Sequence, residues 1–165
     1  MAFSSFEESY ENQRCIIKGI VIIFAIMCLT FVQAAAQATA IPARRQISPE
    51  DLVKRLRNSG NEKPLMIQVG SHVLYAQAHI PGSEYIGPAS TEAGLQQLRK
   101  RVESLPRTNS IILYCGCCPW SHCPNVKPAD DALRSLGFSN VKVLYISDNF
   151  GTNWVDKGYP TAKGE

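Results

Sequence analysis

Apolar residues form several short continuous runs along the chain, and these runs have the length of buried strands. The clearest run covers residues 111–114, and others cover 65–69 and 141–146, with a brief one at Tyr85–Ile86. Because neighbouring positions within these runs are mostly apolar, the best strands are expected to be buried on both faces, as strands of a parallel sheet are.

Between these runs, apolar residues recur at helical spacing. The first such segment begins at Ser48–Pro49, where Ser48 can cap a helix and Asp51 holds the capping-box position, and it ends at Gly60. Pro106 ends another segment, in which Leu95, Leu98 and Val102 share one face. This segment is the predicted helix over 91–105, and the remaining predicted helices cover 71–78 and 128–136.

Strands therefore alternate with helices, which predicts an α/β fold of three layers: a central, mostly parallel sheet with helices on both faces. In such sheets, ligands bind beyond the carboxyl ends of the strands. Cys115 directly follows the strand residue Tyr114, so we expect Cys115 at a ligand-binding end of the sheet.

The N-terminal part of the chain has the composition of a targeting segment. Residues 19–32 are apolar and uncharged, Arg14 and Lys18 precede them, and alanine-rich residues follow. This order predicts a secretory signal peptide over 1–38, cleaved after Ala36 or Ala38. The alternative is an uncleaved membrane anchor. With a cleaved signal peptide, the chain is expected to be periplasmic or secreted; with an anchor, it is expected on the membrane, facing outside the cytoplasm. The rest of the chain is expected to be a linker over 39–47 and one domain over 48–165.

The formal net charge of +3 is small, and the basic residues are scattered in short groups. A nucleic-acid-binding surface needs a denser basic patch, so we expect no nucleic-acid partner. A membrane is expected as a partner only if the N-terminal segment stays uncleaved.

Four of the six cysteines lie in one short loop, which reads CGCCPWSHCPN from Cys115 to Asn125. Cysteines so close together cannot link distant parts of a domain, so their clustering indicates thiol chemistry or metal binding. The expected active-site loop consists of the nucleophile Cys115 with Gly116, Cys117, Cys118, Trp120, His122 and Cys123. A thiolate before a helix N-terminus is stabilised by the helix dipole and by unpaired backbone N–H groups.

Two other uses of this loop remain open. Cys115 and Cys118 form a Cys-x-x-Cys pair that suits thiol–disulfide exchange, with Cys118 or Cys123 as the resolving thiol. Soft metal ions such as copper or zinc bind thiolates and imidazole. The weak candidate ligands are Cys115, Cys117, Cys118, Cys123 and His122, although the separated knuckles of common zinc sites are absent from the sequence.

The order of these motifs resembles the rhodanese-like domain family over residues 47–161. The similar segments are the opening helix at 47–52, the strand at 65–69, the His-Ile-Pro-Gly turn at 79–82, the strand leading to Cys115 and the closing segment with Trp154 and Gly158–Tyr159–Pro160. The resemblance implies a rhodanese-like fold and a sulfurtransferase without a cofactor. Cys115 would take a sulfane sulfur from a small donor such as thiosulfate or a persulfide, and pass it to a thiol or cyanide. The backbone of 116–118 would hold the persulfide.

The chain departs from the family's usual pattern around the site. Its cysteine loop is longer and contains no arginine to bind an anionic sulfur donor. Gln68 and Gly70 stand where the family often has an aspartate and an arginine. These departures leave the expected fold unchanged, but they leave the identity of the sulfur donor open.

Overall fold

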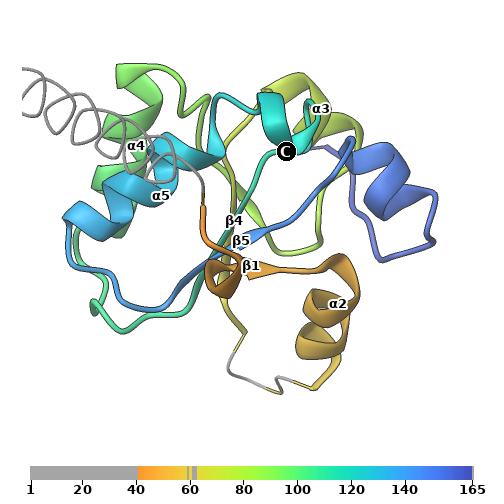
Figure 1. The fold of residues 1–165 in the computed structure, drawn as a ribbon, viewed down its shortest axis with the longest axis horizontal. Helices are drawn as coiled ribbons and strands as arrows, with labels where there is room; N and C mark the ends of the chain where they lie inside the picture. The colour runs from red at the N-terminus through yellow and green to blue at the C-terminus, as the bar shows by residue number, and fades with distance from the viewer. Residues whose placement is uncertain (1–40, 59, 61–62, 165) are drawn as a thin grey trace, which may run out of the picture. The chain divides into compact units, whose positions relative to one another are not determined.

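A computed structural model describes residues 41–58, 60 and 63–164 of the chain. Its centre is a sheet of five parallel strands in the order β1-β5-β4-β2-β3, with β4 in the middle (Figure 1). The strands are β1 (Gln46–Ile47), β2 (Leu65–Gln68), β3 (Glu84–Tyr85), β4 (Ile111–Tyr114) and β5 (Val141–Leu144).

Helices cover both faces of this sheet, which confirms the predicted α/β fold. Helices α4 and α5 pack against each other on one side, and α2 lies on the other side (Figure 1). The helices are α2 (Pro49–Asn58), α3 (His72–Gln77), α4 (Glu92–Val102) and α5 (Val126–Ser135), with short 3-10 turns η1 (Ala43–Arg45) and η2 (Trp120–His122) and a π-helical turn η3 (Gly151–Val155).

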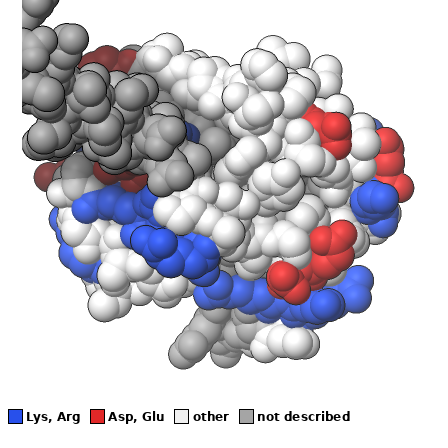
Figure 2. Space-filling model, in the orientation of Figure 1, with Lys and Arg blue, Asp and Glu red and all other residues white. Residues whose placement is uncertain are grey.

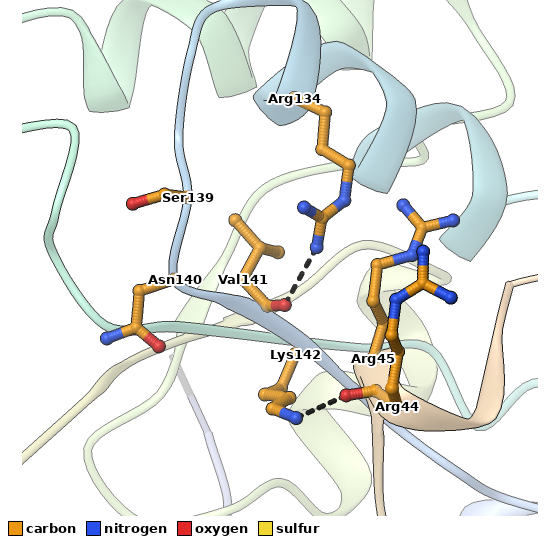
Figure 3. Close-up of a pocket in the computed structure, with 7 residues that line it drawn as sticks. All are labelled: Arg44, Arg45, Arg134, Ser139, Asn140, Val141 and Lys142. Atoms are coloured by element: carbon orange, nitrogen blue, oxygen red, sulfur yellow. Dashed lines mark hydrogen bonds between the residues drawn. The ribbon is translucent and has the colours of Figure 1, made fainter.

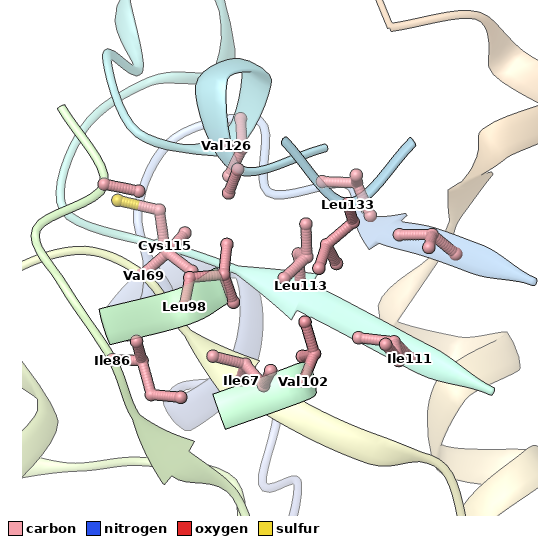
Figure 4. Packing of buried hydrophobic residues seen from close by; sticks show 14 of the residues in the cluster. Ile67, Val69, Ile86, Leu98, Val102, Ile111, Leu113, Cys115, Val126 and Leu133 are labelled. Carbon is pink, nitrogen blue, oxygen red and sulfur yellow. The ribbon is translucent and has the colours of Figure 1, made fainter. Parts of the chain in front are cut away.

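The alternation of side chains along the strands produces two separate hydrophobic clusters, one on each face. In β4, Ile111 and Leu113 join the cluster beneath α4 and α5, while Ile112 and Tyr114 join the cluster that contains Trp154. Figure 4 shows Cys115 at one end of the first cluster, near Val126 of α5. The expected burial on both faces is thus confirmed for β4, whereas both residues of β3 are only partly buried.

The ends of the predicted elements agree with the structure to within a few residues. The Ser48 hydroxyl accepts the Asp51 backbone N–H at 3.1 Å, so the predicted N-terminal cap of α2 is present. Thr91 caps α4, which ends at Val102 instead of 105, and α5 begins at Val126 instead of 128. The boundaries differ because helix ends are decided by local hydrogen bonds that apolar spacing does not report.

The end of the segment expected as a linker over 39–47 contributes to the sheet, whereas residues 39 and 40 lie outside the described part of the chain. Gln46 and Ile47 form β1 and pair with Val143 and Leu144 of β5, and the Tyr145 N–H donates to the Ile47 carbonyl at 2.9 Å. A strand of two residues is too short to show a hydrophobic period, so sequence patterning does not reveal it.

The predicted signal peptide over 1–38 lies outside the described residues. Within the described part of the chain, no helix has the length and apolar character needed to cross a membrane.

Candidate active site

Cys115 occupies the position that the sequence predicts, directly after the central strand β4. Its side chain is 3% exposed, and the next residue, Gly116, has a φ of 74°. This left-handed conformation suits glycine, and a Cβ on Gly116 would lie 2.6 Å from the Cβ of Phe150. The Phe150 N–H also donates to the Gly116 carbonyl at 3.0 Å. The chain therefore turns sharply after Cys115 and stays tightly packed against Phe150.

The turn brings three sulfur atoms into a row. The Sγ atoms of Cys115 and Cys117 are 3.1 Å apart, and those of Cys117 and Cys118 are 3.2 Å apart. All four cysteines of the loop are free thiols. Cys117 thus lies between the two members of the expected Cys115–Cys118 pair and contacts both of them.

Cys123 approaches Cys115 from the N-terminal end of α5. Its interaction with the Cys115 thiol, together with the backbone N–H groups of Asn125 and Val126, lowers the Cys123 pKa to about 6. The interaction with Cys123, together with burial, raises the pKa of Cys115. These opposite directions favour Cys123 over Cys115 as the thiolate of the pair. Burial raises the pKa of Cys118 to about 12.

The lowered pKa of Cys123 predicts unusual reactivity towards alkylating agents. Because only the thiolate reacts, the rate of carbamidomethylation at Cys123 is expected to rise with pH around a midpoint near 6 and to level off above it. Peptide mapping after short iodoacetamide pulses measures this rate. Cys118, which stays protonated at neutral pH, serves as the internal control. A Cys123 midpoint near that of an ordinary thiol, about 8.5, would contradict the assignment.

Three polar or small residues outside the expected site complete the surroundings of Cys115. The Gln68 side chain donates to the Cys115 carbonyl at 3.1 Å and accepts the Gly70 N–H at 3.1 Å. The Asn125 amide donates to the Cys115 sulfur at 3.4 Å and accepts the Ser90 N–H at 2.9 Å. Sequence reasoning did not assign these roles, although a buried glutamine in an otherwise apolar strand was an available signal.

The other expected loop residues lie around the sulfur row. Trp120 packs against Tyr145, with ring centroids 5.0 Å apart. His122 is exposed, its Nδ1 pairs with the Ser121 hydroxyl at 2.8 Å, and its carbonyl accepts from the Cys118 thiol at 3.7 Å. Among the described residues, no group of three or more histidine, cysteine or acidic side chains has an arrangement that could hold a metal ion.

Two hollows adjoin the cysteines on different sides. A cavity of about 10 Å³ is bordered by Cys115, Cys118 and Cys123, and this is close to the smallest space that holds one water molecule. A larger groove of about 400 Å³ is lined by Gly116 and Cys117. The rest of its lining carries no charged side chain and consists of Leu74, Gln77, Ala78, Asn149, Phe150, Gly151 and Val155.

A third hollow, of about 460 Å³, lies at the opposite ends of the strands, where Val141 begins β5. Figure 2 shows Lys and Arg side chains gathered along the lower part of the face drawn, and Figure 3 shows Arg44, Arg45, Arg134 and Lys142 lining this hollow. Most of these cationic side chains already form ion pairs or hydrogen bonds within the chain. Buried Asp130 pairs with Arg45 at 2.6 Å and with Arg134 at 3.1 Å, and Lys142 donates to the Arg44 carbonyl. This arrangement fastens η1 to α5 and β5.

Comparisons with known proteins agree with this architecture. Residues 48–146, more than half of the chain, match the family model of the rhodanese-like domain. The structure is similar to a rhodanese-like domain from Anabaena sp., with a TM-score of 0.52, 22% identity and coverage of 72% of this chain and 79% of that one. It is also similar to a protein from Bacillus halodurans, with a TM-score of 0.55, 19% identity and coverage of 81% and 84%.

A third similar structure is a thiosulfate sulfurtransferase from Pseudomonas aeruginosa, with a TM-score of 0.53 and 26% identity. The match covers 73% of this chain but only 19% of that longer one. The comparison with curated proteins gave no match.

Proposed function

The chain belongs to the rhodanese-like domain family, and from this premise we propose that it is a sulfurtransferase that carries a sulfane sulfur as a persulfide on Cys115. The observation that carries the proposal is the position of the Cys115 sulfur. It lies at the carboxyl end of the central strand, where parallel α/β sheets bind their ligands. The similarity to a thiosulfate sulfurtransferase supports the same reaction class.

The surroundings of Cys115 suit a persulfide. The small cavity that Cys115 shares with Cys118 and Cys123 offers room for one added atom. The Asn125 amide donates to the sulfur and stabilises negative charge on it. Gln68 holds the Cys115 carbonyl, which fixes the backbone from which the thiol projects.

Cys123 supplies the proton acceptor for this chemistry. Because its pKa is lowered while that of Cys115 is raised, Cys123 takes the Cys115 proton as Cys115 attacks. In the attack, the Cys115 sulfur forms a bond to the sulfane sulfur of R–S–SH, and the S–S bond of the sulfur donor breaks. The products are the Cys115 persulfide and R–SH, which takes the proton.

An organic persulfide fits this site better as a sulfur donor than thiosulfate does. The cysteine loop contains no arginine, and no charged side chain lines the groove at Cys117. A dianion entering this groove would lose hydration without gaining an ion pair. We therefore propose an organic persulfide as the sulfur donor and a thiol as the acceptor.

The test is sulfur loading of the anaerobically reduced full chain. Mixed with cysteine persulfide, the wild type is expected to release one equivalent of cysteine per chain. Alkylation within the first seconds is expected to trap a mass gain of about 32 Da on the Cys115 peptide. Cys115→Ser should lose both signals, because the attacking sulfur is absent. Val73→Ala, at an exposed position of α3 that lines neither hollow at the cysteines, should retain them. Equal loading of Cys115→Ser and wild type would refute the proposal.

A further inference from the structure

The contact between Cys115 and Cys117 gives the persulfide an acceptor within the same chain. The two sulfurs are 3.1 Å apart, within the separation of about 3–3.5 Å at which bound reactants are poised to react. Only Gly116 separates the two residues, and its φ of 74° turns the loop so that both thiols lie together. Formation of a disulfide requires the sulfurs to approach by about 1 Å more.

We propose that Cys117 resolves the Cys115 persulfide, expelling its outer sulfur as hydrogen sulfide and leaving a Cys115–Cys117 disulfide. This inference rests on the proposed function, and it defines what happens to the sulfur after loading. It also makes Cys117 a catalytic residue of the site.

The step is balanced without any further reactant. Cys117 Sγ forms a bond to Cys115 Sγ, and the bond between Cys115 Sγ and the outer sulfur breaks. The outer sulfur leaves with the electron pair of that bond and takes the Cys117 proton, so that H₂S is released. The outer sulfur is thereby reduced to sulfide, and the two cysteines are oxidised to the disulfide.

The two cysteines differ in access, and this difference favours the internal reaction. Cys115 is 3% exposed, whereas Cys117 is half-buried and lines the large groove with Phe150 and Leu74. An acceptor thiol from solution reaches the groove and meets Cys117 first. Cys117 is already in contact with Cys115, so its attack has the high effective concentration of an intramolecular reaction.

The same groove provides the route for regeneration. A dithiol that enters it can attack the Cys117 sulfur, displace the Cys115 thiolate and then close its own disulfide to restore both cysteines. Because the groove has no charged lining and its rim includes the exposed side chains of Leu74 and Val155, it suits a dithiol in apolar surroundings. One turnover then consumes a persulfide and a dithiol and yields a thiol, hydrogen sulfide and the dithiol's disulfide.

The experiment is a single turnover of the anaerobically reduced full chain with one equivalent of cysteine persulfide and no other reductant. Wild type is expected to release about one sulfide per chain and to finish about 2 Da lighter. Peptide mapping is expected to locate a disulfide between Cys115 and Cys117. Cys117→Ser is expected to release no sulfide and to keep the mass gain of about 32 Da. Dithiothreitol should return wild type to its starting mass.

Val73→Ala is the control, because Val73 is 64% exposed on α3 and lines neither hollow at the cysteines, and it is expected to behave like wild type. A wild type that keeps its added sulfur and releases no sulfide would overturn the inference and leave the sulfur-carrier function intact. Sulfide release by Cys117→Ser equal to that of wild type would also overturn the role of Cys117 and leave the sulfur-carrier function intact. If neither protein takes up sulfur, the proposed function itself fails.

Discussion

Gly70→Ala is expected to slow sulfur loading of Cys115 by about a hundredfold while leaving the fold intact. A Cβ at position 70 would lie 2.6 Å from the Cys115 sulfur and 3.2 Å from the Gln68 amide nitrogen. The Cys115 side chain can relieve this overlap only by turning its sulfur away, towards a position that separates it from Cys117 and Asn125. A displacement of about 1 Å in a reacting group costs roughly that factor in rate.

The measurement is the rate at which cysteine is released from cysteine persulfide, together with urea unfolding of the same protein. Gly82→Ala is a suitable control, since Gly82 has a φ of 79° and no atom within 4 Å of an added Cβ. It is expected to lose a little stability through backbone strain but to load sulfur at the wild-type rate. Normal loading by Gly70→Ala would show that the position of the Cys115 sulfur is not critical.

Trp154→Ala is expected to lower the free energy of unfolding by about 3–5 kcal/mol, through loss of buried surface and creation of a cavity. Trp154 is completely buried in η3, and its ring lies 5.8 Å from that of Phe150 and 5.2 Å from that of Tyr159. Its indole N–H donates to the Pro160 carbonyl at 2.9 Å. The substitution therefore also leaves that carbonyl without its partner.

Urea denaturation followed by circular dichroism measures this loss, because the signal does not depend on the tryptophan itself. Val155→Ala provides a control on the same turn, since Val155 is 39% exposed and its truncation is expected to cost about 0.5 kcal/mol or less. Because Phe150 also packs on Gly116, we expect Trp154→Ala to slow sulfur loading as well. A loss below about 1 kcal/mol would show that η3 contributes little to the core.

The positions of the strands and of Cys115 follow from local sequence features. Runs such as 111–114 can be buried on both faces only in a sheet that helices cover on both sides. The hydroxyl groups of Ser48 and Thr91 accept backbone hydrogen bonds and cap α2 and α4. Trp154 of the closing segment is also buried in the core. The strand β1 escaped prediction because two residues carry no pattern, and its pairing depends on backbone hydrogen bonds to β5.

The α/β fold, the family and the gathering of four thiols behind the central strand can be read from the sequence, because these depend on periodicity and on the order of residues along the chain. Which thiols meet was decided only by the tertiary structure. The turn at Gly116 brings Cys117 to Cys115, and the Cys115 thiol together with the backbone at the N-terminus of α5 lowers the pKa of Cys123. Sulfur–sulfur contacts and thiol pKa values depend on distances between groups that separate elements position, and spacing along the chain does not encode those distances.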